Sequence, residues 1–412
     1  MDHSSSKKTA VLSIPVIVAA LGYFVDIYDL VLFSIVRKPS LTALGLSGEA
    51  LENSGLFLLN VQMVGMLFGG LFWGILGDKK GRLSVLFGSI LMYSVANILN
   101  AYVSNITQYG VLRFVAGFGL AGELGAGITL VSEILKKEHR GWGTTLVATV
   151  GVSGAILAGL LGLNISWTSC YLVGGVLGLS LLLLRVGVFE SGMYHQTKAA
   201  GHQLGSLRLL FTNGRRRLLY LKCILIGLPI WYTIGILITL SPELGKEMGI
   251  VGDIKPAMAI MYCYAGVTLG DLGSGVMSQL LKSRRKVLAY FVAATLLMVL
   301  VYFQMKGAQA GTLYGVMLVL GFAAGYWAVL MTTSSELFGT NIRATVTTSV
   351  PNFIRAALVP ISLMYTGLQS TGLMKTESAL ATGIACCGIA LWAAIKLPES
   401  FHHELDFHEE HE

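Results

Sequence analysis

Long apolar stretches separated by short polar turns run through the whole chain. About 20 consecutive apolar residues are needed for a helix to cross the hydrocarbon core of a bilayer. Stretches of about this length fall near residues 11–36, 51–77, 83–103, 109–131, 143–163, 167–187, 218–240, 255–281, 287–303, 312–331, 346–367 and 378–397. The pattern therefore predicts an all-α, polytopic membrane protein with 12 transmembrane helices.

The longest polar interruption divides the chain into two halves. Residues 189–217 are rich in Gly, Gln, His and basic side chains, which is typical of a linker outside the membrane. We expect a six-helix bundle over residues 1–188, a cytoplasmic linker over 189–217 and a second bundle over 218–398. A cytoplasmic tail rich in His and acidic residues follows at 399–412.

A short motif recurs at the same place in both halves. Each half contains the pattern Ser-Glu-x6-Arg-x3-Thr-Thr, and the two copies are 203 residues apart. Internal repeats of this kind are typical of transporters built from two related bundles. The two bundles are therefore predicted to be pseudo-symmetric. The copies are Ser132, Glu133, Arg140, Thr144 and Thr145, and Ser335, Glu336, Arg343, Thr347 and Thr348.

The composition agrees with a membrane protein and limits its partners. Of the 412 residues, 54% are hydrophobic and 12% are charged, whereas soluble proteins average about 25% charged. The net charge of +7 comes from basic residues in short turns, so it needs no nucleic acid partner. By the positive-inside rule these turns face the cytoplasm, as do both termini. We expect a multi-pass monomer of the inner (plasma) membrane, surrounded by the lipid bilayer.

The first apolar run is too long for a cleavable signal peptide and lacks a small-residue cleavage site, so it is expected to remain as the first span. The five cysteines lie in or at the edge of spans and show no disulfide spacing, so we expect free thiols. We expect no cofactor and no metal site. A solvated tail is the preferred interpretation of residues 399–412, with metal binding as the alternative.

The turn after the second span carries the motif Gly74-Ile-Leu-Gly-Asp78-Lys79-Lys80-Gly81-Arg82. This motif resembles the signature loop of major facilitator superfamily transporters, except that Leu83 replaces a common basic residue. The resemblance covers residues 10 to 398 and implies two six-helix bundles around a central cavity that opens alternately to each side. It also implies a cytoplasmic gate in which Asp78 lies against the start of the span at 346–367. Its members here are Asp78, Arg82, Glu133 and Arg140, with Glu336 and Arg343 in the second half.

Within that superfamily, several details resemble the cluster of sugar porters and metabolite:proton symporters. These are Gly122-Glu123, the Glu-x6-Arg-Gly loop, Trp167 and Glu190-Ser191. The paired glutamines of sugar porters are missing from the span at 218–240. The span at 143–163 resembles the antiporter motif but lacks its proline, which disfavours drug efflux. A proton-driven exporter of a drug, metabolite or metal species remains the alternative.

Ionisable residues inside spans each cost about 2.5–3.5 kcal/mol on insertion scales. Each of them is either half of a structural ion pair between helices or a functional group, and the set as a whole favours function. Asp26 and Asp29 share one helical face, and both they and Arg113 are predicted in the outer halves of their spans, where they can meet. The resemblance implies that such an Asp–Arg pair couples transport to protons. We assign this role to Asp26 and Arg113, with Asp29 as the substitute. Glu123 is either a second proton site or a buried structural residue.

Arg355 lies near the middle of its span, about 15 Å from either interface at 1.5 Å per residue, so we expect it to face the cavity. Its planar guanidinium suits a carboxylate. Lys222 lies near the inner end of its span, so we expect it to reach the membrane surface, with Asp271 as the candidate partner. We therefore predict proton-coupled symport of a small carboxylate-bearing or zwitterionic metabolite, such as an organic acid or amino acid. Aromatic residues expected to line the substrate site are Trp231, Tyr232, Tyr326 and Trp327.

Other protein classes fit less well. Intramembrane proteases carry two aspartate motifs, which Tyr28-Asp29 and Gly270-Asp271 resemble. The second motif requires Gly-x-Gly-Asp, whereas this chain reads Thr268-Leu-Gly-Asp271. No Gly-x-Ser-x-Gly or His-Glu-x-x-His motif occurs, so we expect no enzyme activity. A channel is disfavoured because two related bundles with gate-like loops suit alternating access.

Overall fold

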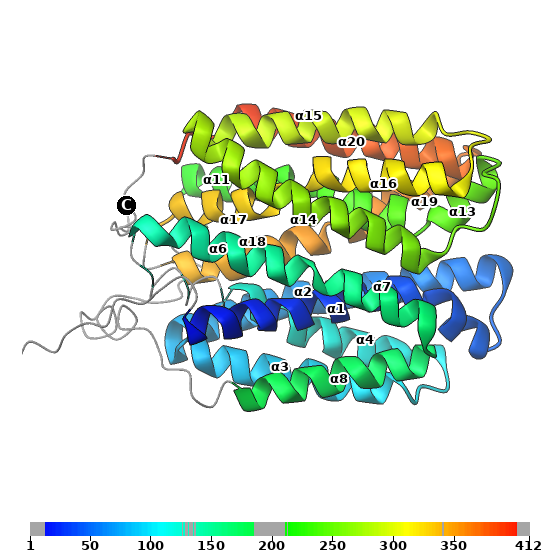
Figure 1. Cartoon of the computed structure of the whole chain (residues 1–412), viewed down its shortest axis with the longest axis horizontal. Coiled ribbons are helices and arrows are strands. Elements are labelled where there is room, and N and C mark those ends of the chain that lie inside the picture. Colours follow the sequence, from blue (N-terminus) through cyan, green and yellow to red (C-terminus); the bar gives the residue numbers. More distant parts are fainter. Residues whose placement is uncertain are drawn as a thin grey trace, which may run out of the picture.

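The structure is a computed structural model that describes residues 13–125, 127, 131, 135, 137–184, 211, 213–339 and 342–401, without the side chains of residues 78, 82, 83, 137–142, 144, 145 and 344. Within this part the backbone is helical apart from turns and one isolated bridge between Val251 and Gln309. The predicted all-α class is confirmed. Most helices run along the long axis of the molecule (Figure 1).

The first half contains seven described helices. They are α1 (Ile14–Ala43), α2 (Gly48–Lys80), α3 (Arg82–Asn100), α4 (Ile106–Leu120), α6 (Lys137–Val152), α7 (Gly154–Asn164) and α8 (Trp167–Leu184).

The second half contains ten described α-helices and one π-helix. They are α11 (Gly214–Ile226), α12 (Leu228–Tyr232), the π-helix (Thr233–Ile238), α13 (Ser241–Glu247), α14 (Pro256–Leu281), α15 (Arg284–Phe303), α16 (Ala310–Ala324), α17 (Trp327–Glu336), α18 (Arg343–Ala356), α19 (Leu358–Ser370) and α20 (Lys375–Ile395).

Helices lie in all twelve predicted spans, although the span at 109–131 is described only in part and has a turn at Ala121 and Gly122 after α4. Four other spans are built from consecutive helices. These are α6 with α7, α11 with α12 and the π-helix, α16 with α17, and α18 with α19. Eight described stretches are long and apolar enough to cross a membrane by length and composition. Periodicity could not predict the breaks, because the pieces on both sides of each break are apolar.

Local chemistry fixes several helix ends. The side chain of Asn105 accepts a hydrogen bond from the backbone N–H of Gln108 at 2.8 Å and so caps α4. Ser283 caps α15 in the same way through the N–H of Lys286 at 3.2 Å. Gly81 adopts a φ of +95°, which a residue with a side chain rarely adopts, and this allows the tight reversal between α2 and α3.

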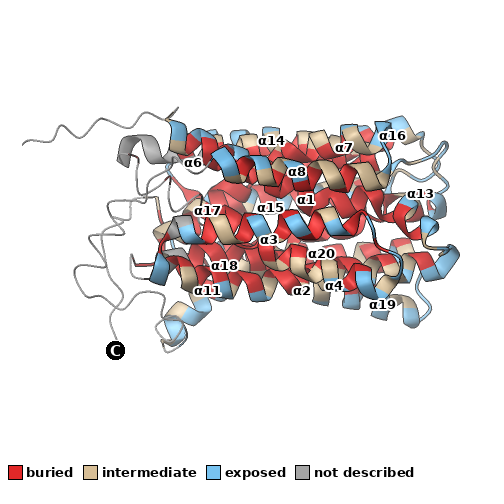
Figure 2. Ribbon diagram, turned by 90° about the horizontal axis from the view of Figure 1, so that it is seen from below, coloured by how far each residue is buried: buried red, intermediate tan, exposed pale blue. Residues whose placement is uncertain are grey.

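The two halves lie side by side, with α3 and α8 along one edge and α15 and α20 along the other (Figure 1). Helices α2 and α18 form one contact between the halves, and α7 and α14 form another. We call one end of the molecule the Gly81 end, after the turn between α2 and α3, and the opposite end the α13 end. Buried residues fill the interior, while many outward-facing side chains are exposed (Figure 2).

Many exposed side chains are large and apolar, for example Leu183 at 75% and Leu280 at 77% exposed. Such a surface is stable against lipid tails, because these are as apolar as leucine. The molecule therefore has the exterior of a membrane protein.

Glycines allow α2 and α4 to pack backbone against backbone. A Cβ atom at Gly117 would lie 2.1 Å from the carbonyl oxygen of Gln62, and one at Gly65 would lie 2.3 Å from that of Phe114. Close contact of this kind is typical of helix pairs in membranes.

We predict that Gly117→Ala lowers the stability of the folded protein by about 1–3 kcal/mol, because the added methyl group forces the two helices apart. The measurement is the midpoint of thermal unfolding in detergent. Gly110→Ala is the matched control in the same helix, since its Cβ would have no neighbour closer than 3.7 Å. Equal midpoints for the two variants would contradict the tight packing.

Candidate functional site

An ion pair between the two halves lies at the centre of the molecule. Arg355, in the last turn of α18, approaches Asp26 of α1 with 3.4 Å between Nη2 and Oδ2. The two side chains are 1% and 0% exposed. The carbonyl groups at the end of a helix favour a cation, which helps to hold Arg355 in this interior.

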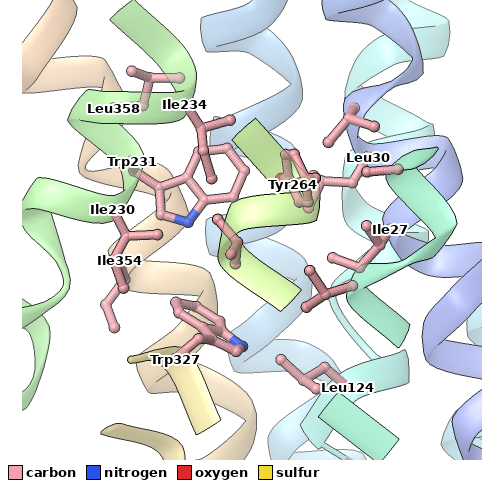
Figure 3. Packing of buried hydrophobic residues seen from close by; sticks show 14 of the residues in the cluster. Ile27, Leu30, Leu124, Ile230, Trp231, Ile234, Tyr264, Trp327, Ile354 and Leu358 are labelled. Atoms are coloured by element: carbon pink, nitrogen blue, oxygen red, sulfur yellow. The ribbon is translucent and has the colours of Figure 1, made fainter. Parts of the chain in front are cut away.

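An aromatic side chain lies beside this pair in the buried interior. The guanidinium carbon of Arg355 lies 5.9 Å from the ring centre of Trp327, within the range of a cation–π interaction. Trp231 and Tyr264 lie in the same buried cluster, together with Ile27 and Leu30 of the first half (Figure 3). The centre therefore combines one fixed cation with flat apolar walls.

A helix break next to this cluster explains the position of Trp327. A Cβ at Gly325 would lie 2.6 Å from the Cα of Gly270, so α14 touches the break between α16 and α17. Asp271 is fully buried there and accepts a hydrogen bond from the backbone N–H of Ala328 at 3.0 Å. This carboxyl group thus satisfies a free N–H group at the start of α17.

Two expected pairings are wrong. Asp26 pairs with Arg355 and not with Arg113, because Arg113 is held elsewhere: its Nη2 donates to Gln62 Oε1 of α2. Lys222 donates to the carbonyl oxygen of Lys396 at 2.8 Å instead of meeting Asp271. Sequence spacing gives the depth of a residue in its span but not the neighbour that its side chain faces.

The other acidic residues of the first half are also buried. A Cβ at Gly174 of α8 would lie 2.2 Å from Asp29 Oδ1, so Asp29 points toward α8. Arg113 lies close enough to Asp29, and Glu123 close enough to Asp26, for their charges to interact. Asp29 therefore lies close to both Asp26 and Arg113, and Asp26 in turn pairs with Arg355 of the second half.

The four aromatic residues expected around the substrate are all buried in the second half, but they differ in their contacts. Trp231 and Trp327 pack among the apolar side chains of the interior (Figure 3). The hydroxyl of Tyr232 instead donates to the carbonyl oxygen of Ala379 at 2.6 Å, and that of Tyr326 donates to Ile226 at 2.8 Å. These two tyrosines bind backbone groups of α20 and α11.

Tight packing closes the interface between the halves toward the Gly81 end. The side-chain amide of Asn352 on α18 donates to the carbonyl oxygen of Ala121 at 2.8 Å. A Cβ at Gly125 would lie 2.4 Å from the Cα of Thr348, and one at Gly70 would lie 2.7 Å from the Cβ of Asn352.

The predicted gate residues are only partly described at this end. Glu133 and the side chains of Asp78, Arg82 and Arg140 lie outside the described residues, so their role stays a prediction. Glu336 pairs with Arg284 at 3.1 Å, and Arg343 donates to the carbonyl oxygens of Ser335 and Phe338 at 3.0 and 3.3 Å. Sequence reasoning missed Arg284, which was assigned only to a basic turn.

Polar side chains close the α13 end. Arg37 Nη2 of α1 lies 2.7 Å from Glu243 Oε1 of α13 and also donates to the carbonyl oxygen of Thr239 at 3.3 Å. Thr239 in turn donates to Ser34 Oγ at 3.0 Å. Sequence reasoning missed Arg37, which directly follows an apolar run, and Glu243, which lies in the polar stretch between the predicted spans at 218–240 and 255–281.

Among the described residues, no three His, Cys, Asp or Glu side chains are grouped as a metal site would require. Residues 402–412 of the tail lie outside the described part of the chain.

Burial raises the pKa of Glu243, but Arg37 and Lys38 outweigh this effect and hold it below its usual value of 4.5. A carboxyl group whose pKa is lowered in the closed arrangement stabilises that arrangement at any pH above its usual pKa. This stabilisation is lost as the pH falls from the usual pKa through the lowered pKa. We therefore predict that the α13 end stays closed from about pH 7 to about pH 5 and opens only at lower pH.

Glu243→Gln should open this end already at neutral pH. The measurement is the distance distribution between spin labels at Ser47→Cys and Lys306→Cys, which lie on the two halves at the α13 end. Glu377→Gln is the control, because Glu377 is exposed at the same end and caps its own helix through the N–H of Met374. Identical distributions for both variants would mean that Glu243 does not hold the halves together.

Comparisons with known proteins agree with the fold. The sequence model described as Major Facilitator Superfamily matches residues 19–359. The 3-(3-hydroxy-phenyl)propionate transporter of Escherichia coli K12 is 28% identical over 82% of this chain and 83% of its own length. The cis,cis-muconate transport protein of Acinetobacter baylyi is 26% identical over 94% of both chains.

Among solved structures, the proton:xylose symporter XylE bound to 6-bromo-6-deoxy-D-glucose superposes with a TM-score of 0.71. The similarity covers 94% of this chain and 96% of the other at 14% sequence identity, so it concerns the fold alone.

Proposed function

Because the chain belongs to the Major Facilitator Superfamily and is a membrane transporter rather than an enzyme, we propose that it carries a small organic acid together with protons by alternating access. The preferred substrate is a carboxylate attached to an aromatic or unsaturated body. Asp26 and Arg355 form the centre of the substrate and proton site, with Asp29, Arg113 and Glu123 as further proton-coupling groups.

The observation that carries this proposal is the loose geometry of the central ion pair. Charge-assisted N–H···O bonds usually measure 2.7–2.9 Å, whereas Arg355 and Asp26 are separated by 3.4 Å. In addition, Asp26 Oδ1 and Arg355 Nε have no hydrogen-bond partner although both are buried. A buried pair with unsatisfied atoms is well suited to exchange one carboxylate for another, or for a proton.

The walls of the site indicate the chemistry of the substrate beyond its carboxylate. Trp231, Trp327 and Tyr264 offer flat apolar faces, which suit an aromatic ring or a conjugated chain better than a hydroxyl-rich sugar. The relatives support this class, since their names refer to 3-(3-hydroxyphenyl)propionate and to cis,cis-muconate. Both compounds carry carboxylate groups on an aromatic or unsaturated carbon skeleton.

The coupling follows from competition for Arg355. While Asp26 is ionised it neutralises Arg355, and protonation of Asp26 frees the guanidinium to bind the substrate carboxylate. Substrate and proton then enter the site together, which is the definition of symport. Lys79 and Lys80 lie at the Gly81 end, as do Lys282, Arg285 and Lys286, so we propose that this end faces the cytoplasm.

We predict that Arg355→Gln raises the half-saturating concentration of 3-phenylpropionate at least about 30-fold, which corresponds to about 2 kcal/mol of lost binding. Arg355→Lys should restore only part of it, because lysine keeps the charge but not the planar fork. The measurement is uptake of radiolabelled substrate into proteoliposomes. Lys222→Gln is the control for loss of a cation in the same half. Saturable transport of neutral hexoses alone would contradict the proposal.

Asp26→Asn tests the proton coupling separately. Without the competing carboxylate, Arg355 should bind substrate at least as tightly as before, so exchange of labelled for unlabelled substrate persists. Accumulation driven by an inward proton gradient should disappear, because no proton is bound with the substrate. Asp29→Asn, measured in parallel, shows whether coupling also needs the second acidic group. Equal loss of exchange and accumulation in Asp26→Asn would indicate a structural role.

A further inference from the structure

A cavity lies at the α13 end, and Arg355 is not among its lining residues. It has a volume of about 600 Å³ and lies between the two halves, so that α1, α2, α13 and the start of α20 all contribute to its wall. Binding sites for small molecules usually measure about 300–1,000 Å³. The charged residues that line it are Lys38, Glu52, Glu243, Lys246, Glu247 and Lys375.

The three acidic residues of this wall are already occupied. Glu52 pairs with Lys375 at 2.6 Å, and Glu243 pairs with Arg37 at 2.7 Å. Glu247 accepts hydrogen bonds from the backbone N–H groups of Lys375 at 3.0 Å and Thr376 at 2.5 Å, at the start of α20. Glu52 and Glu243 therefore join the two halves, Glu247 joins α13 to α20 within the second half, and all three carboxylates are already engaged.

Two of the basic residues are less engaged. Among the described contacts, the ammonium group of Lys246 forms no ion pair and no hydrogen bond, and the residue is exposed. Lys38 Nζ lies 3.4 Å from Glu243 Oε1, and Arg37 Nη2 approaches the same oxygen more closely, at 2.7 Å. The side chain of Lys38 is 39% exposed. The cavity thus offers two ammonium groups to an incoming anion.

We propose that this cavity is an anion-binding vestibule, in which Lys246 and Lys38 capture the carboxylate of an organic acid. That the captured acid is also the transported one rests on the proposed function above. The vestibule is separated from the centre by the contacts of Arg37, Glu243 and Thr239, so a ligand bound there waits at the closed α13 end. Lys38 also touches Glu243, so capture of an anion by Lys38 withdraws one of the two cations that hold Glu243 in place.

The test uses a cysteine introduced by Thr42→Cys, because Thr42 lines the cavity and is exposed, whereas the five native cysteines are buried. The background is Arg355→Gln, which disables the central site. Saturating benzoate should slow the reaction of this cysteine with a neutral maleimide at least fivefold, while benzamide, which has the same shape and no charge, should not. Chloride at high concentration should weaken the protection, since salt screens exposed charges.

Lys246→Gln should raise the half-protecting concentration of benzoate about fivefold, the effect expected for loss of one exposed charge. Lys306→Gln is the matched control, because Lys306 is exposed at the same end but does not line the cavity. Equal protection by benzamide, or equal effects of the two lysine variants, would overturn the vestibule.

The two proposals fail separately. Protection that requires an intact Arg355 would show that the cysteine reports on the central site, which overturns the vestibule and leaves the proposed function standing. If protection persists in the Arg355→Gln background and this variant also transports normally, the vestibule is supported and the proposed function is contradicted.

Discussion

Charge buried in a membrane protein must be neutralised within the protein, and here the two halves neutralise each other. Arg355 of α18 and Asp26 of α1 lie where neither water nor lipid can solvate them. Removing one partner of a buried pair usually costs about 3–5 kcal/mol, because the other is left unpaired. Any molecule that separates the halves must therefore supply a replacement charge, which is the role proposed above for the substrate carboxylate and a proton on Asp26.

The two ends of the interface are closed by different forces. At the α13 end, long side chains form ion pairs and hydrogen bonds that depend on pH and salt, as between Arg37 and Glu243. Toward the Gly81 end, glycines bring backbones together, so that Gly125 touches Thr348 and closure rests on van der Waals packing. The first kind of contact can be broken and remade by charged ligands, whereas the second requires whole helices to move.

Helix breaks gather around the central site. Trp327 begins α17 directly after a break, Arg355 lies one residue before the end of α18, and Trp231 lies in the short α12 before the π-helix. A break frees backbone groups that the membrane cannot satisfy, so it is tolerated only inside the protein. Asp271 satisfies one such group at Ala328. The breaks thus place side chains at the centre that a continuous helix would direct elsewhere.

The sequence by itself determined the helical class, the number and order of the spans and the family, because hydrophobic length and the Gly74–Arg82 motif are local properties. It also identified Asp26, Asp29, Arg113, Glu123 and Arg355 as buried charges, because an ionisable residue in an apolar run is visible without any neighbour. Only the tertiary structure decided which of them meet. The partner of Asp26 is 329 residues away in the sequence, so no local pattern could indicate it. The contacts of Arg37 with Glu243 were decided in the same way, since each residue alone reads as the polar end of a span.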